Sequence, residues 1–190
     1  MNTDTEQKIQ TAFSTLLQQM DASQITVRKI CDSAHISRTT FYTYFSDIDG
    51  LYRYLEEIAL GGMESILNDW RYLDFRAFSP NEPFTPLLKM HRYILLHESL
   101  YAAFMGMHGS MMFRQKFTTV LGASCASFVG RQIHREVTED DFYLQFYVGG
   151  IYNAIYYWLL MPKERRHTPE ELAISETKML RRIISDMQKA

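Results

Sequence analysis

One segment of this sequence concentrates side chains that could contact a nucleic acid. The seven residues Arg38–Tyr44 include one arginine, three threonines and two tyrosines. Arginine can hydrogen-bond to purine edges, a threonine methyl group can touch the methyl group of thymine, and hydroxyl groups can bind phosphate oxygens. A face that meets only water would more often carry lysine and glutamate. The composition of this segment therefore indicates DNA binding.

Two short helices are expected to position these side chains. Thr26 can cap a helix over Val27–Ala34, and Ser37 can cap a helix over Arg38–Tyr44 whose buried pair is Phe41 and Phe45. The short connection between the helices predicts a helix-turn-helix. In that motif the second helix lies in the major groove and its first residues meet base edges.

The charge balance predicts a contact with few phosphates. The whole chain has a formal net charge of -2, and the local cations Arg28, Lys29 and Arg38 are opposed by Asp32. We therefore expect a modest dependence of DNA affinity on salt. Base reading is expected from the second helix and phosphate contacts from the two helix starts. The expected DNA contacts are Thr26, Arg28, Ser37, Arg38, Thr39, Thr40, Tyr42, Thr43 and Tyr44.

The N-terminal region resembles the DNA-binding domain of the TetR/AcrR family of bacterial transcriptional regulators. The residues that carry the resemblance are Ile9, Ala12, Phe13, Leu16, Ile25-Thr26-Val27-Arg28, Ile30, Ala34-x-Ile36-Ser37, Phe41-Tyr42-x-Tyr44-Phe45 and Leu51. The resemblance implies a homodimer that binds a palindromic double-stranded operator, and we expect a repressor. It also implies a C-terminal domain that binds a small effector, whose binding changes the separation of the two recognition helices.

Three positions depart from the pattern of that family. His35 stands where glycine is usual in the turn, and would have to adopt a left-handed conformation. Thr39 replaces a smaller residue. Ile48 stands where a lysine commonly contacts phosphate, so one usual phosphate contact is missing.

The rest of the chain is also expected to be helical. With 190 residues and 46% hydrophobic residues, it can form a compact fold, and no stretch alternates convincingly with the period of a strand. We predict an all-α fold of about nine helices, with a helix-turn-helix domain at residues 1–48 and a helical effector-binding and dimerisation domain at 49–190. Besides the two short helices, those expected span residues 4–19, 47–70, 87–97, 99–107, 113–132, 140–160 and 169–188.

Two of these helices have marked starts and are expected to form the dimer surface. Thr138-x-x-Asp141 resembles a capping box, and Thr168-Pro169-Glu170-Glu171 combines a cap, a first-turn proline and two acidic residues. The family resemblance implies that they pair with their copies as a four-helix bundle; the alternative is packing within one chain. The expected interface residues are Phe142, Phe146, Gly149, Gly150, Asn153, Ala154, Tyr157, Leu172, Met179, Leu180, Ile183, Ile184 and Met187.

The larger domain is rich in methionine and aromatic residues, which suit an apolar effector of unknown identity. The pocket residues we expect are Met63, Trp70, Met90, Tyr93, Phe104, Met107, Phe117 and Leu121. For each of them the alternative is a core residue with no cavity beside it. Phe146-x-x-Gly149-Gly150, Trp158 and Thr168-Pro-Glu-Glu-Leu172 also resemble a TetR branch that includes regulators of dihydroxyacetone kinase operons. Some members of that branch are regulated through another protein, which adds a protein co-regulator as a possible partner.

Other functional classes find little support in the sequence. The histidines form no metal motif such as His-Glu-x-x-His, and neither a glycine-rich phosphate loop nor a Gly-x-Ser-x-Gly sequence occurs, so we expect no enzyme, metal or cofactor. The N-terminus does not read as a signal peptide, and the longest apolar stretch is interrupted by polar residues, which predicts a cytoplasmic protein. Cys31 and Cys125 are expected to be small buried hydrophobes.

Two functions therefore remain open at this point. The first is a TetR-like transcriptional regulator, and the second is an interaction protein of the same fold that a partner protein controls and that binds DNA weakly or not at all. The exposed Thr-Thr-Phe-Tyr sequence favours the first. His35, Ile48 and the thin positive charge favour the second.

Overall fold

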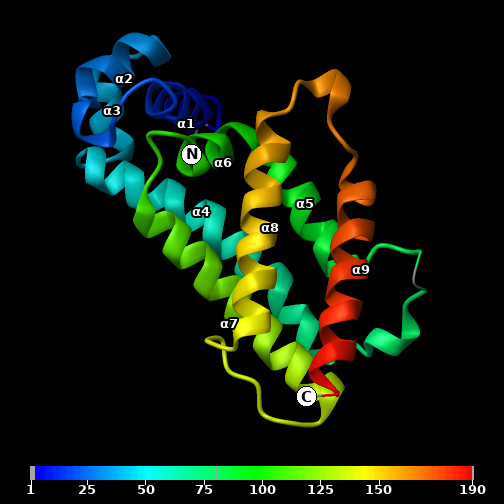
Figure 1. The fold of residues 1–190 in the computed structure, drawn as a ribbon. Helices are drawn as coiled ribbons and strands as arrows, with labels where there is room; N and C mark the ends of the chain where they lie inside the picture. Colours follow the sequence, from blue (N-terminus) through cyan, green and yellow to red (C-terminus); the bar gives the residue numbers. More distant parts are fainter. Residues whose placement is uncertain (1–2, 80, 190) are drawn as a thin grey trace. The chain divides into compact units, whose positions relative to one another are not determined.

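The computed structural model describes residues 3–79 and 81–189 of the chain. Nine α-helices, joined by turns and four short 3-10 helices, form these ranges, and no β-strand occurs within them (Figure 1). The all-α prediction is confirmed. The α-helices are α1 (Thr3–Leu17), α2 (Val27–Ala34), α3 (Arg38–Tyr44), α4 (Ile48–Asn68), α5 (Thr85–Leu96), α6 (Glu98–Met105), α7 (Met111–Ile133), α8 (Phe142–Leu160) and α9 (Pro169–Met187).

The helices divide into two compact units. The first unit comprises the chain up to Ala59 together with His97–Arg114, and the second comprises Leu60–Leu96 together with the chain from Gln115 onward. The first unit thus contains α1, α2, α3 and α6 with the beginning of α4. The second contains α5, α8, α9 and most of α7. The helix-turn-helix therefore packs in one unit with a helix from the middle of the sequence.

An apolar core holds the helices of the first unit together. The side chains of Ile9, Phe13, Ile30, Phe41 and Leu51 are almost fully buried, and they come from α1, α2, α3 and α4. Helix α6 closes this core with Leu100, Tyr101 and Phe104. Complete burial of side chains of this size contributes about 1.5–3 kcal/mol each. The helix that carries the candidate contact residues is therefore anchored from its inner face.

Two tyrosine hydroxyl groups fasten helices within the first unit. The hydroxyl of Tyr101 donates to the carbonyl oxygen of Ala59 at 2.6 Å, which joins α6 to α4. The hydroxyl of Tyr54 donates to a carboxylate oxygen of Glu6, which joins α4 to α1. This hydrogen bond, with a smaller effect of burial, raises the pKa of Tyr54 to about 12.

The second unit is built around a cluster of aromatic rings. Trp70, Phe75, Phe84 and Phe128 pack mainly edge to face, with ring centroids 5.1–5.8 Å apart. Such pairs are favourable beyond the burial of their area. The guanidinium of Arg181 lies 4.6 Å from the centre of the Phe75 ring and also donates to the carbonyl oxygen of Phe78. The cluster therefore ties α9 to the segment that precedes α5.

A histidine and a glutamate are buried against each other inside the second unit, between α5 and α9. His91 Nε2 lies 3.1 Å from Glu176 Oε2, and both side chains are almost completely inaccessible to solvent. The contact has the distance of an ion pair but lacks hydrogen-bond geometry, and the side-chain nitrogen and oxygen atoms of both residues have no hydrogen-bond partner within the described part of the chain. The Trp158 ring packs against the imidazole, and burial raises the pKa of the nearby Tyr147 well above its usual value. Sequence reasoning missed this pair, although Glu176 lies at helical spacing on the same stripe as Leu180 and Ile184.

The predicted capping residue is confirmed for α9 but not for α8. The expected cap at Thr168 is confirmed, and Thr168 and Glu171 form a capping box at the start of α9. The capping box expected from Thr138 is wrong, because Asp141 itself caps α8 by accepting from the amide of Tyr143, and Thr138 instead bonds to Asp140. The fourth helix ends at Asn68, so Trp70 lies in the following 3-10 helix and not in α4.

Three further observations concern membrane-spanning helices, metal sites and the two cysteines. No helix within residues 3–79 and 81–189 combines the length and apolar character needed to cross a membrane. In the same ranges, no three His, Cys, Asp or Glu side chains are grouped in a way that could hold a metal ion. Cys31 and Cys125 are both free thiols and both buried, as predicted, and burial raises the pKa of each.

Candidate nucleic-acid interface

The helix-turn-helix forms with the bounds that the sequence predicts. Thr26 Oγ1 accepts from the amide of Lys29 at 3.3 Å and starts α2, while Ser37 Oγ accepts from the amide of Thr40 at 3.0 Å and starts α3. Each cap satisfies one of the amides that a helix start leaves without a partner. Helix α2 ends at Ala34 and α3 begins at Arg38, so the turn between them has three residues.

The turn between the two helices depends on His35. Its backbone has φ 53° and ψ 47°, the left-handed conformation that the sequence analysis required of it. The amides of His35 and Ile36 both donate to the carbonyl oxygen of Cys31, which closes the end of α2. A histidine therefore performs the role for which glycine is usual, at some conformational cost.

Phe41 anchors α3 in the first unit. Its side chain is fully buried, and its ring packs edge to face on Tyr42 at 5.6 Å and tilted against Phe45 at 5.9 Å. Phe45 is half-buried and also packs on Tyr54 of α4. Because one side of α3 is held by these rings, the opposite side keeps a defined orientation.

The opposite side of α3 exposes four of the predicted contact residues, Arg38, Thr39, Tyr42 and Thr43. Thr40 and Tyr44 are half-buried, so they lie at the edge of this surface. Thr26 and Ser37 are exposed, and both use their hydroxyl oxygens as caps. The structure therefore brings the predicted base-reading residues together on one short helix, with two of them less accessible than the others. We call the four exposed residues the α3 face.

The cations near the α3 face differ in how strongly they are engaged. Arg28 pairs with Asp32 at 3.6 Å one turn along α2, and Lys29 donates to the carbonyl oxygen of Gln24 at 2.9 Å. Arg38 makes no ion pair or hydrogen bond within the described part of the chain. Its guanidinium group therefore has all its donors available for an external acceptor such as a guanine edge or a phosphate.

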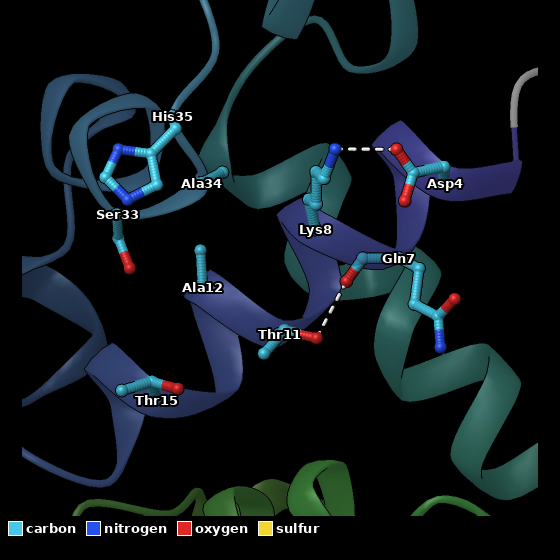
Figure 2. Close-up of a pocket in the computed structure, with 9 residues that line it drawn as sticks. All are labelled: Asp4, Gln7, Lys8, Thr11, Ala12, Thr15, Ser33, Ala34 and His35. Atoms are coloured by element: carbon cyan, nitrogen blue, oxygen red, sulfur yellow. Dashed lines mark hydrogen bonds and ion pairs between the residues drawn. The ribbon is translucent and has the colours of Figure 1, made fainter.

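An open hollow lies beside the turn, between α1 and the end of α2 (Figure 2). Its volume is about 680 Å³, and most of the residues that line it are of polar type, including Gln7, Thr11 and His35. Figure 2 shows that Lys8 on its wall pairs with Asp4, and that the hydroxyl of Thr11 donates to the carbonyl oxygen of Gln7. None of the residues expected for an effector pocket lines this hollow.

The eight residues expected to line an effector pocket are mostly core residues. Met63, Trp70, Met90, Phe117 and Leu121 are fully buried in the second unit, where Tyr93 is half-buried. Phe104 and Met107 belong to the first unit, where Phe104 is buried and Met107 is 91% exposed. The hollows described for the second unit are lined by other residues, such as Leu67, Thr119 and Ser124. The pocket therefore stays a prediction.

The residues expected at a dimer interface divide into three groups by their exposure. Phe142 and Phe146 are 81% and 79% exposed, and Gly150, Asn153 and Tyr157 of α8 and Met179 of α9 are also exposed. Gly149, Ala154, Leu172 and Ile183 are half-buried. Leu180, Ile184 and Met187 are buried within the chain, which corrects their assignment to the interface. The helical spacing of these three residues predicted an interface stripe, but this side of α9 packs into the interior of the chain. Leu172, Met179 and Ile183 lie on a second stripe of the same helix.

Helices α8 and α9 lie side by side (yellow to red in Figure 1). The large apolar residues that α8 leaves exposed are Phe142, Tyr143, Phe146, Tyr157 and Leu160. Within the described part of the chain, a Cβ atom added at Gly149 or Gly150 would have no neighbour within 4 Å outside the backbone of its own helix. Glycine in a helix costs about 1 kcal/mol relative to alanine, and packing within this chain gives no reason for it at these two positions.

Two family models match the chain. The model described as bacterial regulatory proteins of the tetR family matches residues 12–55, and the model described as a transcriptional regulator C-terminal region matches residues 81–184. Together they cover the helix-turn-helix and most of the second unit. No curated protein matches the chain.

Three solved structures of other proteins are similar to this chain to different degrees. A TetR transcriptional regulator from Streptococcus agalactiae is 21% identical, with a TM-score of 0.59 over 93% of each chain. The TetR family repressor AlkX from Dietzia sp. is 18% identical, with a TM-score of 0.48 over 94% of this chain and 97% of that one. The dihydroxyacetone kinase operon activator DhaS is 18% identical, with a TM-score of 0.48 over 97% of each chain. The first of these supports a common all-helical fold.

Proposed function

The chain belongs to the TetR family of bacterial regulatory proteins, and we propose that it is a transcriptional repressor that binds a palindromic DNA operator as a homodimer. In this proposal residues 1–48 bind DNA, and residues 49–190 dimerise and bind a small apolar effector that releases the operator. The protein acts in the cytoplasm, where its DNA target lies.

The α3 face is the observation that carries the proposal. It presents the guanidinium of Arg38 and the hydroxyl of Tyr42 without partners in the described part of the chain, on a helix held from behind by Phe41. Unpaired donors on a rigid helix can exchange their hydrogen bonds to water for hydrogen bonds to base edges and phosphates. Thr26, Arg28 and Ser37 at the starts of α2 and α3 are the proposed phosphate contacts, with Thr40 and Tyr44 at the edge of the surface.

The exposed apolar side chains of α8 support the homodimer. Phe142, Phe146 and Tyr157 form a patch that water solvates poorly, and patches of this kind mark interaction sites. The open space beside Gly149 and Gly150 would let a second helix approach closely. A two-fold contact here would present two α3 faces to two half-sites, as a palindromic operator requires.

The test of this proposal begins with selection of bound sequences from a randomised duplex pool. The selected duplex and a scrambled duplex are then compared by fluorescence anisotropy for wild type, Tyr42→Phe, Arg38→Ala and Arg28→Ala. We expect Arg38→Ala to weaken binding to the selected duplex by roughly ten- to a hundredfold and to reduce discrimination. Tyr42→Phe, which loses one phosphate contact, should weaken both duplexes slightly. Arg28→Ala should weaken both duplexes alike and lower the salt dependence.

A second candidate function is an interaction protein of the same fold that a partner protein controls. The engagement of Arg28 and Lys29 with neighbouring groups favours it, because few free cations remain to hold phosphates. For this candidate, the pure protein should enrich no sequence from the pool, and it should co-purify with its partner from its own cells. Enrichment of a sequence by the pure protein would exclude it.

A further inference from the structure

Two threonines of the α3 face differ in the state of their hydroxyl groups. Thr39 and Thr43 are four residues apart, so they lie one above the other on the same side of the helix, and both are exposed. Thr43 Oγ1 donates to the carbonyl oxygen of Thr39 at 3.0 Å. The hydroxyl of Thr39 makes no hydrogen bond within the described part of the chain. Two identical residues thus offer different chemistry to an external partner.

The difference follows from the single hydrogen atom of a hydroxyl group. A threonine hydroxyl can donate one hydrogen bond and accept two. Because Thr43 has given its hydrogen to the backbone, it cannot donate to a guanine edge, to thymine O4 or to a phosphate without breaking that bond. What it offers without breaking that bond is its methyl group and, as an acceptor only, its hydroxyl oxygen. Thr39 keeps its donor, so it can make any of those contacts.

The third threonine of the helix does not share this position. Thr40 is half-buried, and its hydroxyl lies 2.9 Å from that of Ser37, so it is engaged at the start of the helix. Among the threonines of α3, Thr43 alone is both exposed and committed to the backbone through its hydroxyl. Its neighbour Tyr42 is also exposed.

We propose that Thr43 recognises the 5-methyl group of a thymine in the operator by apolar contact, and that Thr39 contacts the DNA through its hydroxyl. In the major groove, the methyl group distinguishes thymine from every other base, and a threonine methyl group is a suitable contact for it. This assignment rests on the proposed function, since it names the base that part of the α3 face selects. It predicts an A·T pair at a fixed position of each half-site.

The experiment uses the duplex selected by the full-length protein. Each thymine in turn is replaced by deoxyuridine, which lacks only the methyl group, and affinity is measured by anisotropy for wild type, Thr43→Val and Thr43→Ser. We expect one thymine per half-site whose replacement weakens wild type about fourfold, the change that corresponds to one buried methyl group. Thr43→Val should keep both the affinity and the sensitivity. Thr43→Ser should lose about the same affinity and show no sensitivity at that thymine.

Thr39 provides the matched control on the same helix. Thr39→Val removes the hydroxyl and should weaken binding about fivefold, the change that corresponds to one hydrogen bond. Thr39→Ser keeps the hydroxyl and should bind nearly as wild type. The valine and serine variants are therefore expected to rank in opposite order at the two positions. A general effect of valine or serine on the helix would rank them in the same order at both.

The outcomes separate this assignment from the proposed function. If the pool yields no enriched sequence, the proposed function fails and the assignment fails with it. If a sequence is enriched but no deoxyuridine replacement changes the affinity, the regulator remains and the methyl contact is wrong. A loss in Thr43→Val with wild-type binding by Thr43→Ser would show that the hydroxyl makes the contact, and it would also overturn the assignment.

Discussion

In the first unit the exposed side of α3 carries hydroxyl and guanidinium groups, whereas in the second unit the exposed side of α8 carries aromatic rings. Both interiors are largely apolar, and each also buries polar side chains. Apolar side chains such as Phe13 and Phe41 fill the interior behind α3, where Glu56 is also buried, while the second unit buries His91 and Glu176 against each other. Polar groups left outside suit a partner that is itself polar, such as DNA. Apolar groups left outside suit a partner that excludes water, such as a second copy of the chain.

The largest effect should come from breaking the buried pair of the second unit. In Glu176→Ala, the buried His91 would lose the carboxyl group that faces it and a cavity would remain, so we expect the free energy of unfolding to fall by about 3–5 kcal/mol. Urea denaturation measures this change. The matched control is Glu170→Ala, which breaks the exposed pair of Arg92 and Glu170 between the same two helices and should change stability little. Equal losses in the two variants would contradict the role given to burial.

A smaller but still large effect is expected from the apolar surface of α8. Phe146→Glu would place a carboxylate in the proposed contact of each copy, and we expect the dimer to weaken by about a hundredfold or more. Analytical ultracentrifugation over a concentration series measures the association. Gln145→Glu adds the same charge at the neighbouring exposed position and should leave association nearly unchanged. If Phe146→Glu associates as the wild type does, α8 does not carry the dimer.

A modest gain is expected at the two left-handed histidines, one in each unit. His35 and His134 have φ values of 53° and 56°, where glycine is favoured by roughly 1–2 kcal/mol. Glycine also costs more backbone entropy on folding. We therefore expect His35→Gly and His134→Gly each to raise the free energy of unfolding by up to about 1 kcal/mol, as measured by thermal and urea denaturation. A loss of stability in either variant would mean that the histidine side chain itself supports its turn.

The smallest effect should appear at alkaline pH. The hydrogen bond to Glu6 raises the pKa of Tyr54 to about 12, and burial raises the pKa of Tyr147 well above its usual value near 10. In both cases the unfolded chain loses its proton first, so the stabilisation is complete below pH 10 and is lost as pH rises through the folded pKa. Tyr54→Phe and Tyr147→Phe should each flatten the decline of stability above pH 10. Unfolding measured at pH 9 and pH 11 checks this, and an unchanged decline in both variants would contradict it.

Sequence reasoning predicted best the features that neighbouring residues decide. The bounds of α2 and α3, the caps at Thr26 and Ser37 and the left-handed His35 all depend on hydrogen bonds that span a few residues. It predicted less well the features that depend on which side of a helix turns inward. Leu180 and Ile184 have the spacing of an interface stripe, yet they pack inside the chain.

The sequence by itself determined the all-α fold, the helix-turn-helix and the resemblance to TetR regulators, because helical periodicity and capping are encoded locally. The three-dimensional structure decided that Thr39 and Thr43 differ, through one hydrogen bond within α3 from the Thr43 hydroxyl to the carbonyl oxygen of Thr39. It also decided that His91 meets Glu176, since helices distant in the sequence must pack before the two side chains face each other. Contacts of this kind depend on how helices rotate and dock, which a pattern of residue types does not specify.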